Sequence, residues 1–139
     1  MDPGQASTAV ERHLVFVYGT LKRGHGNHHW LAEAVFLGTT SLRGAVLHDL
    51  GPFPMAIEGE GTVWGEVYGV DEPGLARLDR LEGCPRLYRR CRRVLADGRR
   101  AWVYLGSWRQ VRNVPRVADG CWHGPRRGGG VGKSHQPLP

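Results

Sequence analysis

Cysteine is scarce in this chain of 139 residues, and long apolar runs are missing. The three cysteines, Cys84, Cys91 and Cys121, include no C-x-x-C pair, which argues against a disulfide framework and against a zinc knuckle. No apolar run approaches the roughly 20 residues that a membrane helix needs, and 1–11 contains no apolar segment that could act as a signal peptide. We therefore expect a cytoplasmic protein with reduced thiols that does not enter a membrane.

The sequence also lacks the signatures of several enzyme classes. No serine stands in a G-x-S-x-G context, and the turn at 18–24 matches neither G-x-x-x-x-G-K-S/T nor G-x-G-x-x-G. The clustered histidines His25, His28 and His29 have no H-E-x-x-H spacing and no matched carboxylate or thiol. Cys84 has no histidine beside it that could activate its thiol. We therefore predict no metal, no cofactor and no covalent nucleophile supplied by the protein.

Acidic residues are outnumbered by basic ones, 13 to 19, which leaves a net charge of +6. Three of these positive charges lie in 125–139, where there is no acid, and most of the rest come from arginines between Arg86 and Arg100. Runs such as 89–93 are usually the solvated edges of strands, where arginine discourages strand-to-strand aggregation. Because the aromatic and basic interleaving of an RNA-binding sheet is missing, we do not expect nucleic acid as a partner. A nucleic-acid-associated role for the basic tail stays open as an alternative.

Hydrophobic residues make up 40% of the chain, which is enough for one packed core. We predict one folded domain over 12–123, with disordered tails at 1–11 and 124–139, because the tails contain little that could pack. Many strands with two short helices predict an α+β fold on a closed or nearly closed sheet. The predicted strands are 13–18, 35–50, 55–57, 63–70, 88–95 and 101–104, with a last strand or loop around 114–122.

Local signals place the helices and turns. A helix is predicted over 72–82, because Asp71 is a typical N-cap and Gly83 ends the apolar repeat. A shorter helix around 28–34 is predicted to begin at the N-cap Asn27. Turns are predicted at 51–54, 58–61 and 96–98.

Glu82 closes the longer helix and is the carboxylate that we expect to do chemistry. The negative end of a helix disfavours a carboxylate and raises its pKa, as partial burial also would. A general base is poised in this way. A glutamate at a helix end is nevertheless most often exposed and inert, and this alternative stays open.

A glycine-containing turn follows the first strand at 18–24. Successive backbone amides at the strand end, with Gly19 free to adopt unusual dihedrals, would form a small anion nest that suits a carboxylate. The alternative is a plain turn. Together with Glu82, this turn suggests a proton acceptor that faces a cradle of amides.

Three segments of the chain resemble a known family. They are YGTLKRG at 18–24, GEVY at 65–68 and the stretch 78–90, in which the matching residues are Leu78, Asp79, Leu81, Glu82, Gly83, Pro85, Tyr88 and Arg90. In this order and spacing they resemble the gamma-glutamylcyclotransferase-like family, in particular its branch with gamma-glutamylamine cyclotransferase. The similarity spans about 13–107.

The resemblance implies a small mixed β-barrel with flanking short helices around a cavity. It implies an enzyme that cyclises a gamma-glutamyl amide to 5-oxoproline, releases a free amine or amino acid, and uses Glu82 as general base. The residues implied to hold the glutamyl end of this small-molecule substrate are Tyr18, Gly19, Thr20 and Leu21. Tyr88 is a further candidate for lining the pocket, with simple packing as the alternative.

The implied chemistry fits what the chain lacks. In a gamma-glutamyl amide the α-amine reaches its own γ-carbonyl, so the nucleophile comes with the substrate and neither a metal nor a covalent intermediate is required. The leaving amine stays open: a free amino acid, an ε-lysyl isopeptide, a glutathione-like peptide or a gamma-glutamyl protecting group all fit. The alternative function is a non-catalytic protein that binds a small acid in the same cavity. The oligomeric state is not predicted.

Overall fold

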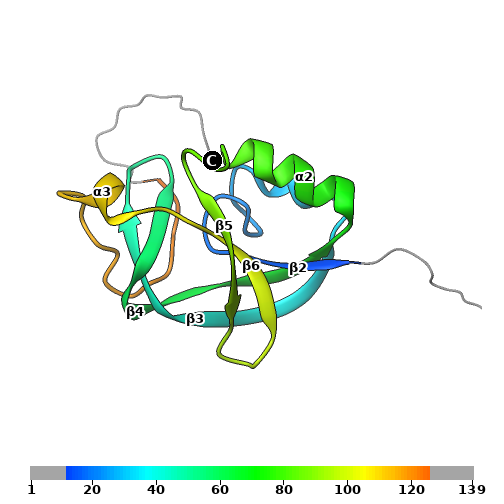
Figure 1. Cartoon of the computed structure of the whole chain (residues 1–139), viewed down its shortest axis with the longest axis horizontal. Coiled ribbons are helices and arrows are strands. Elements are labelled where there is room, and N and C mark those ends of the chain that lie inside the picture. Colours follow the sequence, from blue (N-terminus) through cyan, green and yellow to red (C-terminus); the bar gives the residue numbers. More distant parts are fainter. Residues whose placement is uncertain (1–11, 126–139) are drawn as a thin grey trace, which may run out of the picture.

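The computed structural model of the chain describes residues 12–125, which form an α+β fold with one five-stranded sheet and few helices (Figure 1). The predicted tails are 1–11 and 124–139, of which 1–11 and 126–139 lie outside the described residues, so the domain limits stay a prediction. The strands are β2 (His13–Val17), β3 (Val35–Asp49), β4 (Pro54–Val70), β5 (Arg89–Val94) and β6 (Arg100–Leu105). The helices are the 3-10 helix η1 (His28–Leu31) and the α-helices α2 (Glu72–Leu81) and α3 (Trp108–Val111).

Strand β2 lies at the centre of the sheet, whose order is β3-β4-β2-β6-β5. It pairs antiparallel with β4 and parallel with β6. Val15 and Val17 enter one core cluster, and Phe16 and Tyr18 enter another. Burial of both faces explains why this strand reads as a continuous apolar run in the sequence.

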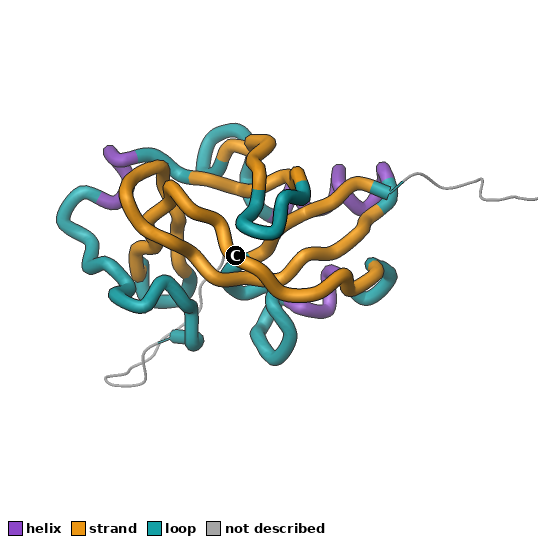
Figure 2. Tube along the Cα trace, turned by 90° about the horizontal axis from the view of Figure 1, so that it is seen from below, coloured by secondary structure: helices purple, strands orange, loops and turns teal. Residues whose placement is uncertain are grey.

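The predicted closed barrel is only approximate, because the edge strands β3 and β5 do not pair in a ladder. Figure 2 shows a strongly curved sheet with the helices at its margin. One backbone hydrogen bond spans the gap, from the amide of Ala96 to the carbonyl of Ser41 (2.8 Å). The sheet is therefore curved and nearly closed at one end, but open along the rest of its edges.

The predicted turn at 58–61 is wrong, because β4 runs without interruption from Pro54 to Val70. Its glycines mark close approach to β3. A Cβ on Gly59 would lie 2.9 Å from a methyl group of Val46, and one on Gly61 would lie 2.8 Å from the carbonyl oxygen of Ala45. Glycine is therefore required here by the close approach of β3, at an irregularity of the ladder where 59–61 lie opposite Gly44.

Helix α2 is confirmed. The Asp71 carboxylate accepts a hydrogen bond from the amide of Gly74 (2.8 Å), and Gly83 follows the helix with a φ of 66°. Leu75 and Leu78 are buried against the sheet. The helix therefore packs on the core and delivers Glu82, its C-cap residue, to a fixed place.

The second predicted helix is shorter than expected and capped differently. Asn27 occupies the N-cap position of η1, but its side chain makes no capping hydrogen bond and donates to the hydroxyl of Thr20 instead (3.0 Å). Helix α3 was not predicted from the sequence. The segment after it forms a single antiparallel bridge between Arg116 and His48 of β3. Within 12–125, no helix is long and apolar enough to cross a membrane.

Substitution of Gly65 by alanine is expected to destabilise the fold by about 1 to 3 kcal/mol, because overpacking strains a close contact. The added Cβ would lie 2.4 Å from the carbonyl oxygen of Val17 and 2.7 Å from the ring of Phe16. Gly26→Ala is the matched control, because nothing lies within 4 Å of its added Cβ. Urea unfolding of the two variants measures the difference, and equal stabilities would contradict this view of the strand contact.

Candidate active site

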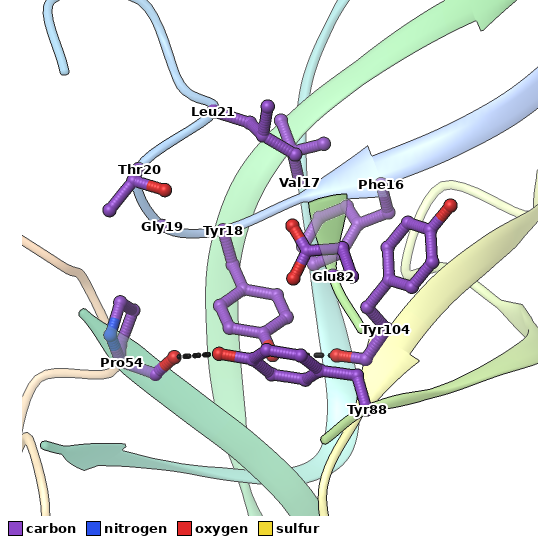
Figure 3. Close-up of a pocket in the computed structure, with 10 residues that line it drawn as sticks. All are labelled: Phe16, Val17, Tyr18, Gly19, Thr20, Leu21, Pro54, Glu82, Tyr88 and Tyr104. Atoms are coloured by element: carbon purple, nitrogen blue, oxygen red, sulfur yellow. Dashed lines mark hydrogen bonds between the residues drawn. The ribbon is translucent and has the colours of Figure 1, made fainter. Parts of the chain in front are cut away.

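A pocket opens where β2 ends, and it contains all five residues predicted as site residues. Figure 3 shows the lining, which consists of Phe16, Val17, Tyr18, Gly19, Thr20, Leu21, Pro54, Glu82, Tyr88 and Tyr104. The space in the pocket is small, about 30 Å³, which is room for one or two water molecules. Thr20 is the one predicted binding residue that is still partly exposed.

Glu82 is buried in this pocket, with 6% of its surface exposed. Burial raises the pKa of Glu82 from 4.5 to about 8. Figure 3 shows its carboxylate directed toward the side of the pocket formed by Tyr18 to Leu21. Within 12–125 this carboxylate accepts no hydrogen bond from a side chain or an amide. A buried carboxylate without a partner is costly, and it is available to take a proton.

The backbone amides of Gly19, Thr20 and Leu21 donate no hydrogen bond to any group within the described part of the chain. Their carbonyls help to hold the turn. The amide of Lys22 donates to Gly19 (3.0 Å), and the amide of Asn27 donates to Thr20 (2.8 Å). The turn is thus fixed while three successive amides keep their donor capacity, as an anion nest requires.

Gly19 is required for a different reason from the one predicted. Its φ is not in the left-handed region, so unusual dihedrals are not its role. A Cβ on Gly19 would instead lie 2.7 Å from the ring of Pro54. The glycine lets β4 approach the turn, and the Pro54 ring closes that side of the pocket.

The phenol groups of Tyr18 and Tyr88 are used inside the protein. The Tyr18 hydroxyl donates to the carbonyl of Tyr104 (2.6 Å) and accepts from the amide of Ala56 (3.1 Å). The Tyr88 hydroxyl donates to the carbonyl of Pro54 (2.8 Å). Burial raises the pKa of both phenols well above the ordinary value. Tyr88 therefore both lines the pocket and packs, and Tyr18 offers a ligand its ring and backbone.

Sequence reasoning did not find Tyr104 as a pocket residue. Its hydroxyl donates to Oδ1 of Asp79 (2.8 Å), and the same oxygen accepts from Nε of Arg90 (2.8 Å). Asp79 and Arg90 both belong to the segment 78–90 that carries the family resemblance. The available signal was therefore that an acid and an arginine are among the matching residues. Tyr104 itself enters the pocket only because β6 runs parallel beside β2.

Glu66 connects two of the segments that carry the family resemblance, 65–68 and 18–24. Its Oε1 accepts hydrogen bonds from the amide of Arg23 (2.9 Å) and from the hydroxyl of Tyr68 (3.0 Å). The guanidinium of Arg23 lies 4.1 Å from the ring centroid of Phe36. Strand β4 thereby anchors the far end of the 18–24 turn, with Glu66 only 9% exposed.

The histidine-rich stretch supports the same turn. His28 hydrogen-bonds through Nδ1 to the carbonyl of Leu21 (2.9 Å), while burial and the nearby Lys22 ammonium lower the pKa of His25. Among the residues from 12 to 125, no group of three His, Cys, Asp or Glu side chains could hold a metal ion.

Residues 15–124 match the family model described as gamma-glutamyl cyclotransferase, AIG2-like. The gamma-glutamylcyclotransferase family protein YtfP of Escherichia coli strain K12 is 38% identical over 108 residues, which cover 78% of this chain and 94% of that protein. The gamma-glutamylaminecyclotransferase of Bos taurus is 43% identical over 91 residues, which cover 56% of this chain and 53% of that protein. The crystal structure of an AIG2-like protein from Mus musculus matches with a TM-score of 0.65 at 28% identity, covering 84% of this chain and 98% of that one.

Glu82→Gln is expected to stabilise the fold at alkaline pH. Because burial raises the pKa of Glu82 from 4.5 to about 8, the native state holds its proton over a range where the unfolded state has lost it. Stability therefore falls by about 1.4 kcal/mol per pH unit across that range, a loss that is absent below pH 4.5 and complete above pH 8.

The difference in unfolding free energy between the wild type and Glu82→Gln should thus change by about 3 to 5 kcal/mol between pH 4.5 and pH 9. Denaturant unfolding at both pH values measures it. Glu60→Gln, at an exposed position, is the control. A difference that does not change with pH would show that Glu82 titrates normally.

Proposed function

The chain belongs to the gamma-glutamyl cyclotransferase, AIG2-like family, and we propose that it cyclises gamma-glutamyl amides to 5-oxoproline with release of a free amine or amino acid. The observation that carries this proposal is the buried carboxylate of Glu82, which has no hydrogen-bond partner within 12–125 and is directed toward the side of the pocket formed by 18–21, where the amides of 19–21 donate to no described group. One group accepts a proton and the others stabilise negative charge, which is what an internal acyl transfer needs.

The proposed reaction is the attack of the substrate's α-amine on its own γ-carbonyl. A new C–N bond closes a five-membered lactam, the γ-amide C–N bond breaks, and the proton lost by the α-amine is returned to the leaving amine. Glu82 carries this proton between the two nitrogens. Well-oriented internal attack corresponds to effective molarities of roughly 10⁵ M or more, so holding the substrate folded supplies much of the acceleration.

The amides of Gly19, Thr20 and Leu21 are proposed to bind the glutamyl end, either its α-carboxylate or the γ-carbonyl oxygen as negative charge develops there. Tyr18 contributes its ring and backbone, because its hydroxyl is already hydrogen-bonded. A glutamyl group is larger than the present cavity, so the proposal requires the pocket to widen on binding. The partly exposed side at Thr20 is where the wall can move.

The test is turnover on a panel of gamma-glutamyl compounds: a gamma-glutamyl amino acid, an ε-lysyl isopeptide, a glutathione-like peptide and a gamma-glutamyl alkylamine. 5-Oxoproline and the released amine are both measured. Glu82→Gln should lose activity by about 10²- to 10⁴-fold, because a general base contributes about that much, while Glu60→Gln should not change. A fully active Glu82→Gln variant would falsify the base role. A folded wild type that turns over no member would favour the small-acid binder.

The pH profile of kcat/KM is expected to be bell-shaped, with its maximum near pH 8 to 9. In the reacting complex, one of the two groups, Glu82 or the substrate's α-amine, carries the ionisable proton and the other does not. The pKa of Glu82 is about 8, and an α-amine next to a carboxylate titrates at about 8 or above. Activity therefore falls on the acid side, where both groups are protonated, and on the alkaline side, where neither is. Initial rates from pH 6 to pH 10 check this, and a flat profile would contradict it.

A further inference from the structure

The segment after Glu82 and helix α3 meet around a second cavity, separate from the pocket that contains Glu82. Its volume is about 290 Å³. Three arginines line it, Arg86, Arg89 and Arg109. The other lining residues are Pro85, Leu87, Leu105, Gly106, Ser107 and Gln110, so no acidic residue is among them and none is shared with the first pocket.

The backbone around this cavity is fixed by hydrogen bonds. The side-chain amide of Gln110 donates to the carbonyl of Leu87 (2.8 Å), and its oxygen accepts from the amide of Ser107 (2.8 Å). One side chain thus joins α3 to the segment that carries Arg86 and begins β5. Leu105 contributes to the lining with only 1% of its surface exposed. The three arginines are therefore brought together by a built structure, although they come from three different elements.

The charge of these arginines is not compensated inside the protein. Within 12–125, none of their guanidinium groups makes an ion pair or a hydrogen bond, and all three residues are exposed. On the same hairpin, by contrast, Arg90 pairs with Asp79 (2.8 Å) and Arg93 pairs with Glu58. Three like charges around one concave surface attract an anion, and concavity strengthens the field.

We propose that this cavity binds an anion of the phosphate class. A single carboxylate satisfies one guanidinium fork. A phosphate group offers three or more acceptor oxygens and up to two negative charges, and a diphosphate offers more of both. The cavity is larger than an inorganic phosphate needs, so it leaves room for the group that carries the phosphate. The proposal does not rest on the cyclisation proposed for the other pocket.

Isothermal titration of the full chain with pyrophosphate and with inorganic phosphate tests the proposal at low and at physiological salt. Pyrophosphate is expected to bind saturably, and Arg86→Gln combined with Arg109→Gln is expected to weaken it at least tenfold. The matched control combines Arg77→Gln with Arg112→Gln, which removes the same charge from exposed positions outside the cavity. That control should stay within twofold of the wild type.

Arg109→Lys keeps the charge but loses the planar fork, so it should weaken pyrophosphate less than Arg109→Gln does. Absence of saturable binding of both probes would overturn the proposal. Equal weakening in the control would also overturn it, because binding would then follow net charge alone. Citrate that binds as tightly as pyrophosphate through the same arginines would overturn the assignment to the phosphate class.

Discussion

The hydroxyl of Tyr18 joins the three strands around the Glu82 pocket. It accepts from the amide of Ala56 in β4 and donates to the carbonyl of Tyr104 in β6, at the point where β2 ends. These two bonds fix the direction in which the chain leaves β2, and with it the position of the unpaired amides. Tyr18, whose ring is expected to contact the substrate, thereby also holds in place the wall of the pocket that carries these amides.

Glu82 is placed by the length of α2. The Asp71 cap fixes the start of the helix, Leu75 and Leu78 fix its rotation on the sheet, and Gly83 turns the chain away directly afterwards. The carboxylate is consequently held inside the protein, where ionisation costs stability. Natural proteins keep such costs mainly at sites where the chemistry needs them.

Local signals were sufficient for helix α2 and for the turn between β5 and β6, but not at Asn27, whose side chain donates to Thr20 in place of capping η1. Asp71 and Gly83 bound the helix, and Asp97-Gly98 marks a real hairpin turn, because caps and turns depend on a few adjacent residues. Sequence reasoning failed where the cause lay on another strand, as when Gly61 was interpreted as a turn although it accommodates β3. Tyr104 was missed for the same reason. The grouping of Glu82 with the 18–24 turn was suggested by the two segments together, and the family resemblance supplied the reaction and the roles of Tyr18 to Leu21.

The smallness of the cavity beside Glu82 bears on the outcome of the proposed reaction. Water is always a competing nucleophile for an activated amide, and its attack would give glutamate in place of the lactam. The space in this structure, about 30 Å³, holds one or two water molecules, and a glutamyl group that widens the pocket on binding would take their place. In the proposed reaction, the walls formed by Pro54, Tyr88 and Leu21 would protect ring closure against hydrolysis, so that the product would depend on exclusion of solvent as much as on the base.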